Sequence, residues 1–514
     1  MKHPGIPLLK ICAVALRSTP LDVPPLTPCP TRQATLYQEG VRHLMHIKAL
    51  PLALLLMLLT SAARSQNTTQ NPGVPPVTSS GVTGGNSLHP KPATTSPANE
   101  APGPETPNSV NLRPFIFVLP RDHFFGDWLG VRTSLEDAGV TPTLTYLTDI
   151  AGNVSGGKNQ GVAYADNIGL NLLFDLNKLA GIDGGSFLLS MTQRDGSSLS
   201  QRHVHNAFST QQDFGGQTFH LLNVAYQQQL FDDHIELRIG RLSAGDDFLV
   251  SKYDYLFEQN GFDGNPVGIF FNAPGMSAYP AATWGALLKV LPTKRTYIMG
   301  GIYNGDASIR ENEYHGANFS MDGPVFAIGE MGYRCNGLPG DSQYLGDYKV
   351  GGWYDDNLYT DYNSGASTRG NWGAYALFDQ VVFPFGEMYS NRGLGIFGSA
   401  ILSPDETRSQ LPYFFTGGFA WRGISEARPT DMVAFGFEWG QFSDDLRSSE
   451  LREAGLGVPI AGQGHEEVME WLYRFNFDKR RLFFQPDIQY VIHPNGTETY
   501  RNALVLGCQI GINF

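Results

Sequence analysis

The feature that most constrains this chain is an alternation of apolar and polar residues, repeated in short stretches from Thr143 to Phe514. Apolar residues occupy every second position in 168–172 and again in 235–239, with Asn, Gly, Glu or Arg between them. Successive side chains of a β-strand point to opposite faces, so this period of two predicts strands that are apolar on one face only. The stretch 326–333 can be phased either way.

The alternating stretches are short, and turn residues such as Gly, Pro, Asn and Asp separate them. We expect about sixteen strands, near 143–151, 166–176, 185–194, 218–230, 234–242, 283–291, 296–304, 325–334, 346–355, 371–383, 393–402, 412–421, 432–441, 466–476, 482–492 and 503–514.

The connections between these strands fall into two length classes that alternate along the chain. Long connections such as 195–217 and 243–282 take turns with short ones such as 231–233 and 292–295. A membrane barrel has tight turns on one side and longer loops on the other, whereas a soluble β-sandwich has no reason for this asymmetry. An even strand number near sixteen suits a barrel wide enough for an aqueous channel. We therefore predict an all-β fold, a transmembrane antiparallel β-barrel of about sixteen strands, with both termini on the periplasmic side.

The composition agrees with a wall that is apolar on one face. Only 17% of residues are charged, 12% are aromatic, and there are 59 glycines. Outside the N-terminal region, no apolar run reaches the roughly 20 residues that a membrane-spanning helix needs. The net charge of −13 argues against a nucleic-acid partner and against a dedicated anion pore, because both would require an excess of Lys and Arg.

The N-terminal region has the pattern of an export signal, although it does not begin at Met1. The segment Met45–Lys48 is short and basic, and the apolar stretch Ala49–Leu59 follows it. We expect residues 1–65 to comprise an incorrectly assigned start and a signal peptide that is removed on export. Export of a barrel with this pattern predicts the outer membrane of a Gram-negative bacterium, where lipid surrounds the wall.

Two further segments precede the first strand. Residues 66–107 are rich in Pro, Thr, Ser and Gly, and we expect a disordered linker because the segment has little to bury. The barrel domain then extends over 108–514 and opens with a short N-terminal helix near 127–138. Asp127 can cap the start of this helix, and Gly139 suits its end.

Nothing in the sequence indicates catalysis, a cofactor or a metal. The segment His465–Met469 lacks the second His of a zinc-protease helix, and no Gly-x-Ser-x-Gly elbow with partners is present. Cys335 and Cys508 are too few for a disulfide framework, and their spacing is not that of metal ligands. We expect a protein that is not an enzyme and needs no cofactor.

The chain ends in an alternating strand closed by an aromatic residue, Phe514. The machinery that assembles barrels in the outer membrane reads a terminal strand of this kind, so we expect the barrel assembly machinery to recognise this chain through Phe514.

Several segments carry a family resemblance. They are Phe125–Arg132 (Phe-Gly-Asp-Trp-Leu-Gly-Val-Arg), Leu135–Gly139, Asp149–Asn153, Tyr375–Gln380, Gly417–Gly423, Arg428–Asp431, Phe484–Tyr490 and His493–Gly496. In this order they resemble the carbohydrate-selective porin family (OprB-type) over about residues 120–514. Leu129 stands where that family often has Gly. The resemblance implies a sixteen-stranded barrel that conducts glucose-like sugars down their gradient; it favours a monomer, whereas general porins are often trimers.

Selection of a sugar requires groups that bind hydroxyls and rings that stack on its C–H faces. The long connection 243–282 is rich in carboxylates and aromatic rings, so it either folds inward to narrow the pore or covers the surface. Arg194 faces the lumen or lies at the rim, and the direction of Arg241 after Gly240 stays open. The candidate constriction residues are Arg194, Glu236, Arg238, Arg241, Asp246, Asp247, Tyr253, Tyr255, Trp128 and Arg132.

Other polar groups within strands should face inward as ordinary wall residues, because lipid exposure would be costly. These are Glu330, Asp379, Gln380, Glu470, Asp487 and Gln489. Two alternative functions share part of this pattern: a general diffusion porin without sugar preference, and, more remotely, an exported soluble β-protein that binds glycans. The expected partners are thus monosaccharides and other small polar solutes.

Overall fold

The computed structural model describes residues 123–514, except 263, 336–342, 386–391, 459 and 478–481. The expectations for 1–65 and 66–107 lie outside the described residues.

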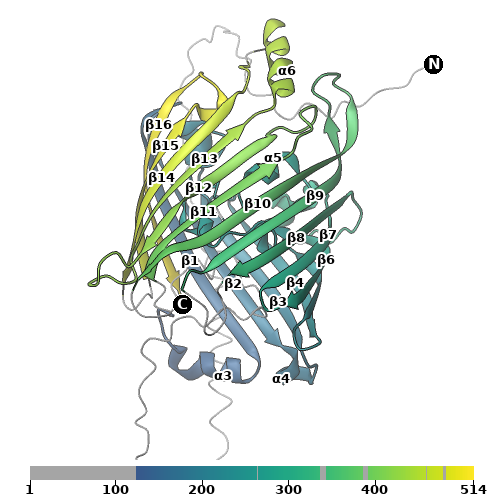
Figure 1. Cartoon of the computed structure of the whole chain (residues 1–514), viewed down its shortest axis with the longest axis vertical. Coiled ribbons are helices and arrows are strands. Elements are labelled where there is room, and N and C mark those ends of the chain that lie inside the picture. The colour runs from purple at the N-terminus through teal and green to yellow at the C-terminus, as the bar shows by residue number, and fades with distance from the viewer. Residues whose placement is uncertain (1–122, 263, 336–342, 386–391, 459, 478–481) are drawn as a thin grey trace, which may run out of the picture. The chain divides into compact units, whose positions relative to one another are not determined.

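Sixteen antiparallel strands form a closed barrel, in which every strand is hydrogen-bonded to its neighbours in sequence and β1 is bonded to β16 (Figure 1). The strands are β1 (Val140–Gly157), β2 (Gly161–Asp175), β3 (Gly185–Gly196), β4 (Thr218–Leu230), β5 (Ile235–Leu242), β6 (Thr283–Thr293), β7 (Thr296–Asn304), β8 (Val325–Cys335), β9 (Gly346–Thr360), β10 (Ser367–Phe385), β11 (Arg392–Leu402), β12 (Tyr413–Arg422), β13 (Met432–Gln441), β14 (His465–Phe477), β15 (Leu482–Ile492) and β16 (Arg501–Asn513). The predicted fold class is confirmed.

Closure satisfies the backbone of the first and last strands. β1 pairs with β16 from Thr145↔Asn513 to Gly157↔Arg501, with register shifts beyond Asn153. A closed ladder leaves no free edge, which is a condition for strands that cross a bilayer.

Short helical segments lie in the connections. They are η1 (Trp128–Gly130), α3 (Val131–Asp137), α4 (Leu176–Ala180), η2 (Ser200–Val204), η3 (Ala244–Asp246), η4 (Asp254–Leu256), α5 (Gly268–Asn272), η5 (Ala307–Arg310), η6 (Asn312–Tyr314), α6 (Asp444–Gly455) and η8 (Pro494–Gly496). None of these helices in the described part of the chain is long and apolar enough to cross a membrane. α6 stands at the end of the barrel opposite α3 and α4 (Figure 1).

The alternation places apolar side chains outside and a mixed set inside. The ambiguous stretch 326–333 is resolved: Phe326, Ile328 and Glu330 are buried, whereas Met331 is 54% exposed on the outer face. The wall is therefore apolar outside at β8, and a carboxylate lies on its inner face.

The inner wall contains an apolar arc, which we define by the buried inward residues of β6 to β12: Leu287, Met299, Tyr303, Phe326, Ile328, Trp353, Tyr375, Leu377, Ile401 and Phe414. Phe248, Leu249, Val267 and Ile269 belong to the same cluster and come from the connection 243–282. Burial of one such side chain contributes about 1.5–3 kcal/mol. The apolar arc thus gives this connection a reason to lie inside the barrel.

The N-terminal helix is shorter than the predicted 127–138. α3 begins at Val131 because Leu129 and Gly130 both have positive φ, 60° and 90°. Asp127 is not the N-cap of α3, which is Gly130, but its carboxylate still accepts hydrogen bonds in the first turn from Thr133 N (2.9 Å) and Thr133 Oγ1 (2.6 Å). The left-handed conformation at Leu129 explains why glycine suits this position.

Leu129→Gly is expected to raise the free energy of unfolding by about 1 kcal/mol, because a left-handed conformation costs an L-residue roughly 1–2 kcal/mol. The Leu129 side chain is fully exposed, so its removal forfeits no packing. The urea midpoint of the protein folded in detergent micelles measures this change. Ser134→Gly, within α3, is the control and should lower the midpoint; an unchanged or lower midpoint for Leu129→Gly would contradict the interpretation.

Candidate functional site

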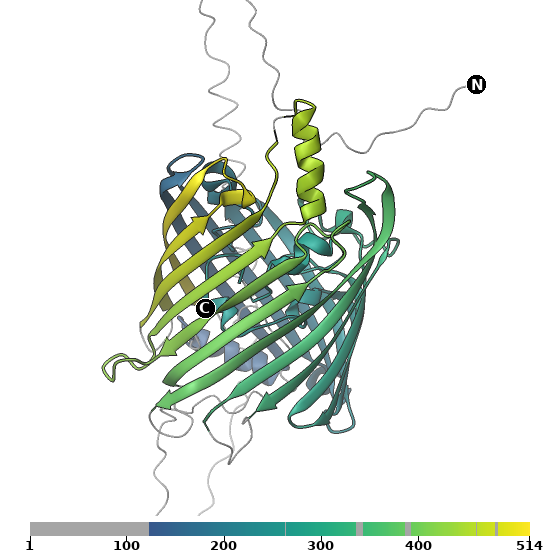
Figure 2. The ribbon, with the colours of Figure 1, turned by 45° about the horizontal axis from the view of Figure 1, so that its top comes forward.

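Two long connections fold into the barrel: the β3–β4 loop (197–217) and the β5–β6 loop (243–282). Leu199 and Phe208 of the β3–β4 loop are 0% exposed, as are Phe257 and Ile269 of the β5–β6 loop. The segment that carries α5 lies within the ring of strands in both views (Figures 1 and 2). Of the two arrangements considered for the β5–β6 loop, the structure has the inward one.

The two loops are bonded to each other. Gln212 N donates to Glu258 O over 2.9 Å, and Asn260 N donates to Ser209 O over 2.8 Å. The Gln212 side chain adds a bond to Phe257 O (2.7 Å). These backbone contacts make the two loops one packed unit inside the barrel.

Arg194 lies where this unit meets the inner face of β3. Its guanidinium stands 4.9 Å from the centroid of the Tyr279 ring and donates to Gln212 O over 3.1 Å. Its Nε has no hydrogen-bond partner among the described residues. The Tyr279 hydroxyl is within 2.6 Å of Asn167 Oδ1 and of Thr192 Oγ1. We call Arg194, Tyr279, Asn167 and Thr192 the Arg194 cluster.

Tyr279 was missed by sequence reasoning. The available signal was its aromatic ring, but the connection 243–282 contains several aromatic residues. Nothing in the sequence indicated that Tyr279 contacts Arg194. An arginine, an amide, a hydroxyl and an aromatic ring are the types of group that suit a sugar, and here Arg194, Asn167 and Thr192 are buried where the loops meet the wall.

Glu236, Arg238 and Asp247 come together as a buried ion triad. Arg238 bonds Glu236 Oε1 (2.5 Å) and Asp247 Oδ2 (2.9 Å), and Arg238 is only 5% exposed. Glu236 and Arg238 share the polar face of the alternating stretch 235–239, and the structure pairs them. The triad ties the first turn of the β5–β6 loop to β5.

The electrostatics of the loop residues follow from burial. Asp246 accepts from Asn223 Nδ2 (3.1 Å), and burial together with the neighbouring Asp247 raises the pKa of Asp246 to about 7. Burial likewise raises the pKa of Asp213 in the β3–β4 loop to about 7, while the nearby Arg194 opposes that shift.

Arg241 donates hydrogen bonds to backbone carbonyls. It is 1% exposed, and it donates to Asn318 O (2.6 Å) and to Ala282 O (2.9 Å). Gly240, at φ 142°, lets the strand turn so that Gly240 and Arg241 are both buried. Arg241 therefore connects the β5–β6 loop to the β7–β8 loop (305–324).

The two tyrosines that were candidate constriction residues, Tyr253 and Tyr255, have different surroundings. Tyr255 is 2% exposed and packs with Leu147, Val250 and Phe483. Tyr253 is half-buried, and the ammonium of Lys252 lies 5.3 Å from its ring centroid. Of these two, Tyr253 keeps a partly exposed side chain.

Trp128 and Arg132 lie apart from the Arg194 cluster. They belong to η1 and α3, and α3 packs on β1 at the short-turn end of the barrel (Figure 1). Arg132 forms an ion pair with Glu136 one turn later (3.6 Å). η1 and α3 therefore belong to the base of the barrel.

Three residues that the sequence analysis assigned to the inner wall hold the β5–β6 loop. Glu330, Asp379 and Glu470 each accept a backbone N–H of the β5–β6 loop: from Leu249 (2.9 Å), Lys252 (3.2 Å) and Glu258 (2.9 Å), respectively. Within the described ranges, no group of three or more His, Cys, Asp or Glu side chains could hold a metal ion.

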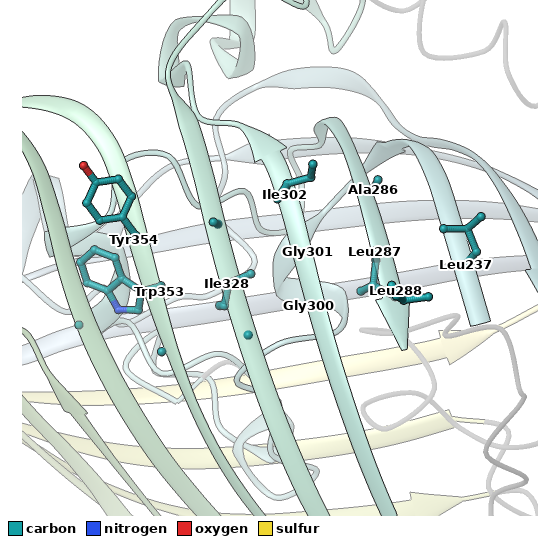
Figure 3. A pocket seen from close by; sticks show the side chains of 14 residues that line it. Leu237, Ala286, Leu287, Leu288, Gly300, Gly301, Ile302, Ile328, Trp353 and Tyr354 are labelled. Atoms are coloured by element: carbon teal, nitrogen blue, oxygen red, sulfur yellow. The ribbon is translucent and has the colours of Figure 1, made fainter. Parts of the chain in front are cut away.

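A separate hollow of about 730 Å³ is lined by residues of the consecutive strands β5 to β10 (Figure 3). Its lining includes Leu288 and Ile302, which are exposed on the outer face, and the backbone of Gly300, Gly301 and Gly329. This lining is largely apolar, so the hollow is unsuited to binding sugar hydroxyls.

Comparison with known proteins agrees with this architecture. Residues 159–514 match the family described as carbohydrate-selective porin, OprB family. Porin B of Pseudomonas aeruginosa is 26% identical over 424 residues, covering 75% of this chain and 90% of that protein. The putative porin QuiX of Acinetobacter baylyi is 25% identical over 433 residues, covering 77% and 93%.

A solved structure, described as the high pH structure of Pseudomonas putida OprB, superposes with a TM-score of 0.71 at 26% identity. The match covers 77% of this chain and 100% of that one. The family match spans more than half of the chain and includes every strand from β2 to β16. The chain therefore belongs to the OprB family of carbohydrate-selective porins of the Gram-negative outer membrane.

Proposed function

We propose that the β3–β4 and β5–β6 loops form the constriction of this porin, and that the Arg194 cluster is where glucose-like sugars are selected during passive diffusion into the periplasm. The observation that carries the proposal is the guanidinium of Arg194 over the Tyr279 ring (4.9 Å) where both loops meet the wall. A diffusing sugar must bind weakly enough to leave, and one cationic donor beside an aromatic face meets that condition.

The orientation of the barrel follows from the same proposal. The long inserted loops face the outside of the cell, and the short turns, α3 and the C-terminus face the periplasm, as is usual for outer-membrane barrels. Solutes then meet the constriction before they reach the α3 end.

We further propose that Phe514 is the element read during barrel assembly. Its backbone N–H donates to Leu144 O (2.9 Å), and its ring stacks on Phe125 at 5.5 Å between centroids. The terminal residue thus joins the end of β16 to β1 and to the segment before α3, and a folded barrel keeps it in place.

Arg194→Ala is expected to lower sugar uptake relative to uptake of size-matched amino acids by about threefold to tenfold, which corresponds to one hydrogen bond of roughly 1 kcal/mol. Swelling of liposomes that contain the mature protein measures both rates. Arg369→Ala is a matched control, because Arg369 is exposed and pairs only with Asp356 on the surface.

The unsubstituted protein is measured first in the same assay. Faster uptake of glucose than of amino acids of equal size supports selection at the constriction. Rates that depend on solute size alone would reduce the function to general diffusion. An Arg194→Ala variant with unchanged preference would remove the Arg194 cluster from the selective site.

A further inference from the structure

We infer that two glutamates on the inner face of β14, Glu466 and Glu470, position both inserted loops and thereby set the width of the constriction. The inference rests on the proposed role of those loops as the constriction. It assigns a function to wall residues that touch neither the Arg194 cluster nor, as proposed, the sugar.

Each glutamate holds two consecutive backbone amides of one loop. Glu466 accepts from Ala207 N and from Phe208 N of the β3–β4 loop, both at 2.8 Å, and its carboxylate also accepts from Asn495 N of the β15–β16 connection (2.5 Å). Glu470 accepts from Glu258 N (2.9 Å) of the β5–β6 loop and from the next amide along the chain (3.0 Å). We call the pair of bonds from one glutamate to one loop a clamp. β14 therefore carries one clamp for each loop.

The two clamps lie on the same face of β14. Residues four apart on a strand point to the same face and are separated by about 13 Å. Both carboxylates are 0% exposed, so water does not compete for their oxygens. β14 thus fixes the spacing between the two clamped segments.

The clamped segments are also bonded to each other. The Gln259 side chain donates to Phe208 O over 2.6 Å. Phe208 is held by Glu466, and Gln259 is held by Glu470, so the bonds form a closed circuit with β14. A closed circuit resists displacement of either loop alone, because movement of one breaks bonds of both.

A short chain of bonds connects this circuit to the Arg194 cluster. Glu470 holds Glu258 N, Glu258 O accepts from Gln212 N (2.9 Å), and Gln212 O accepts from Arg194 (3.1 Å). Release of the Glu470 clamp should therefore move the segment that orients Arg194, although Glu470 itself lies on another strand.

Glutamine is the sharpest substitution at both positions. It preserves the size of the side chain but replaces one acceptor oxygen with an NH₂ donor, which then faces a backbone N–H. Glu466→Gln and Glu470→Gln each remove half of one clamp. Glu467→Gln is the matched control, because Glu467 lies between them in sequence, is partly exposed and contacts His465 instead of a loop.

The experiment compares the uptake of a disaccharide with that of glucose in liposomes that contain the full mature protein. We expect Glu466→Gln and Glu470→Gln to raise the disaccharide-to-glucose ratio by about threefold, since each loses one hydrogen bond that holds a loop. Glu467→Gln should keep the ratio of the unsubstituted protein. Equal ratios in all four proteins would overturn the inference.

Amide hydrogen exchange of the unsubstituted protein tests the clamps even if a variant does not fold. The amides of Ala207, Phe208, Glu258 and Gln259 should exchange as slowly as amides of the barrel strands. Exchange as fast as in an exposed loop would overturn the inference. The test is separable from that of sugar selection: absence of a sugar preference would defeat the proposed selectivity, whereas the size ratio and the exchange rates still report on the clamps.

Discussion

Arg238→Ala is expected to lower the free energy of unfolding of the barrel by about 3–5 kcal/mol, one of the two largest single-residue losses that we expect. Arg238 lies between Glu236 Oε1 and Asp247 Oδ2, at 2.5 and 2.9 Å, and all three side chains are at most 6% exposed. Truncation leaves two buried carboxylates without their cation. The urea midpoint of the protein refolded in detergent micelles measures the loss.

An exposed pair of similar geometry is the control. Arg369 and Asp356 are 2.8 Å apart, but the Arg369 side chain is 64% exposed, so Arg369→Ala should cost less than about 1 kcal/mol. Neutralisation of the whole triad, with Arg238→Met, Glu236→Gln and Asp247→Asn together, should recover much of the loss because no buried charge remains unpaired. Equal costs for Arg238→Ala and Arg369→Ala would show that the triad is hydrated.

Glu330→Leu is expected to cost about 3–9 kcal/mol, because three donors, one of them on the half-buried Tyr297, lose their acceptor and each such loss costs roughly 1–3 kcal/mol. The Glu330 carboxylate accepts from the hydroxyls of Tyr297 (2.6 Å) and Tyr375 (2.9 Å) and from Leu249 N (2.9 Å). Leucine preserves much of the volume but accepts no hydrogen bond. The same urea titration measures the effect.

Tyr297→Phe is the control for Glu330→Leu. It removes one donor and leaves the carboxylate with its other two, so about 1 kcal/mol should be lost. A Glu330→Leu variant no less stable than Tyr297→Phe would mean that water replaces the carboxylate. The β5–β6 loop would then be held at this point mainly by the apolar arc.

The sequence predicted the wall because a half-buried strand has a local signature. Alternation, short turns and long loops gave the class of fold, and the predicted strand number is confirmed. The boundaries differ at the ends of some strands. β1 continues to Gly157 and β10 starts at Ser367, in segments rich in Gly, Ser, Thr and Asn that show no alternation. The period of two is imposed by lipid on one face, so it fades where lipid ends.

The segments that resemble the porin family are also short, contiguous stretches of sequence, so they can be recognised without the structure. They predicted the family, and the match over residues 159–514 confirms it. The departure at Leu129 was also visible in the sequence, but its physical meaning was not, because a positive φ is a property of the folded backbone.

The channel interior was decided by the tertiary structure. The cost of lipid exposure predicted that Glu330 and Glu470 face inward, and Arg194 was expected either in the lumen or at the rim. Neither expectation carries information about what each side chain meets across the lumen. Their partners are Tyr279, Leu249 and the Glu258 amide, which belong to other connections or strands. Contacts between residues so distant in sequence form only when sixteen strands close into a ring and two loops fill its centre. The sequence alone therefore determined the barrel and its family, whereas the arrangement of the constriction depends on that closure.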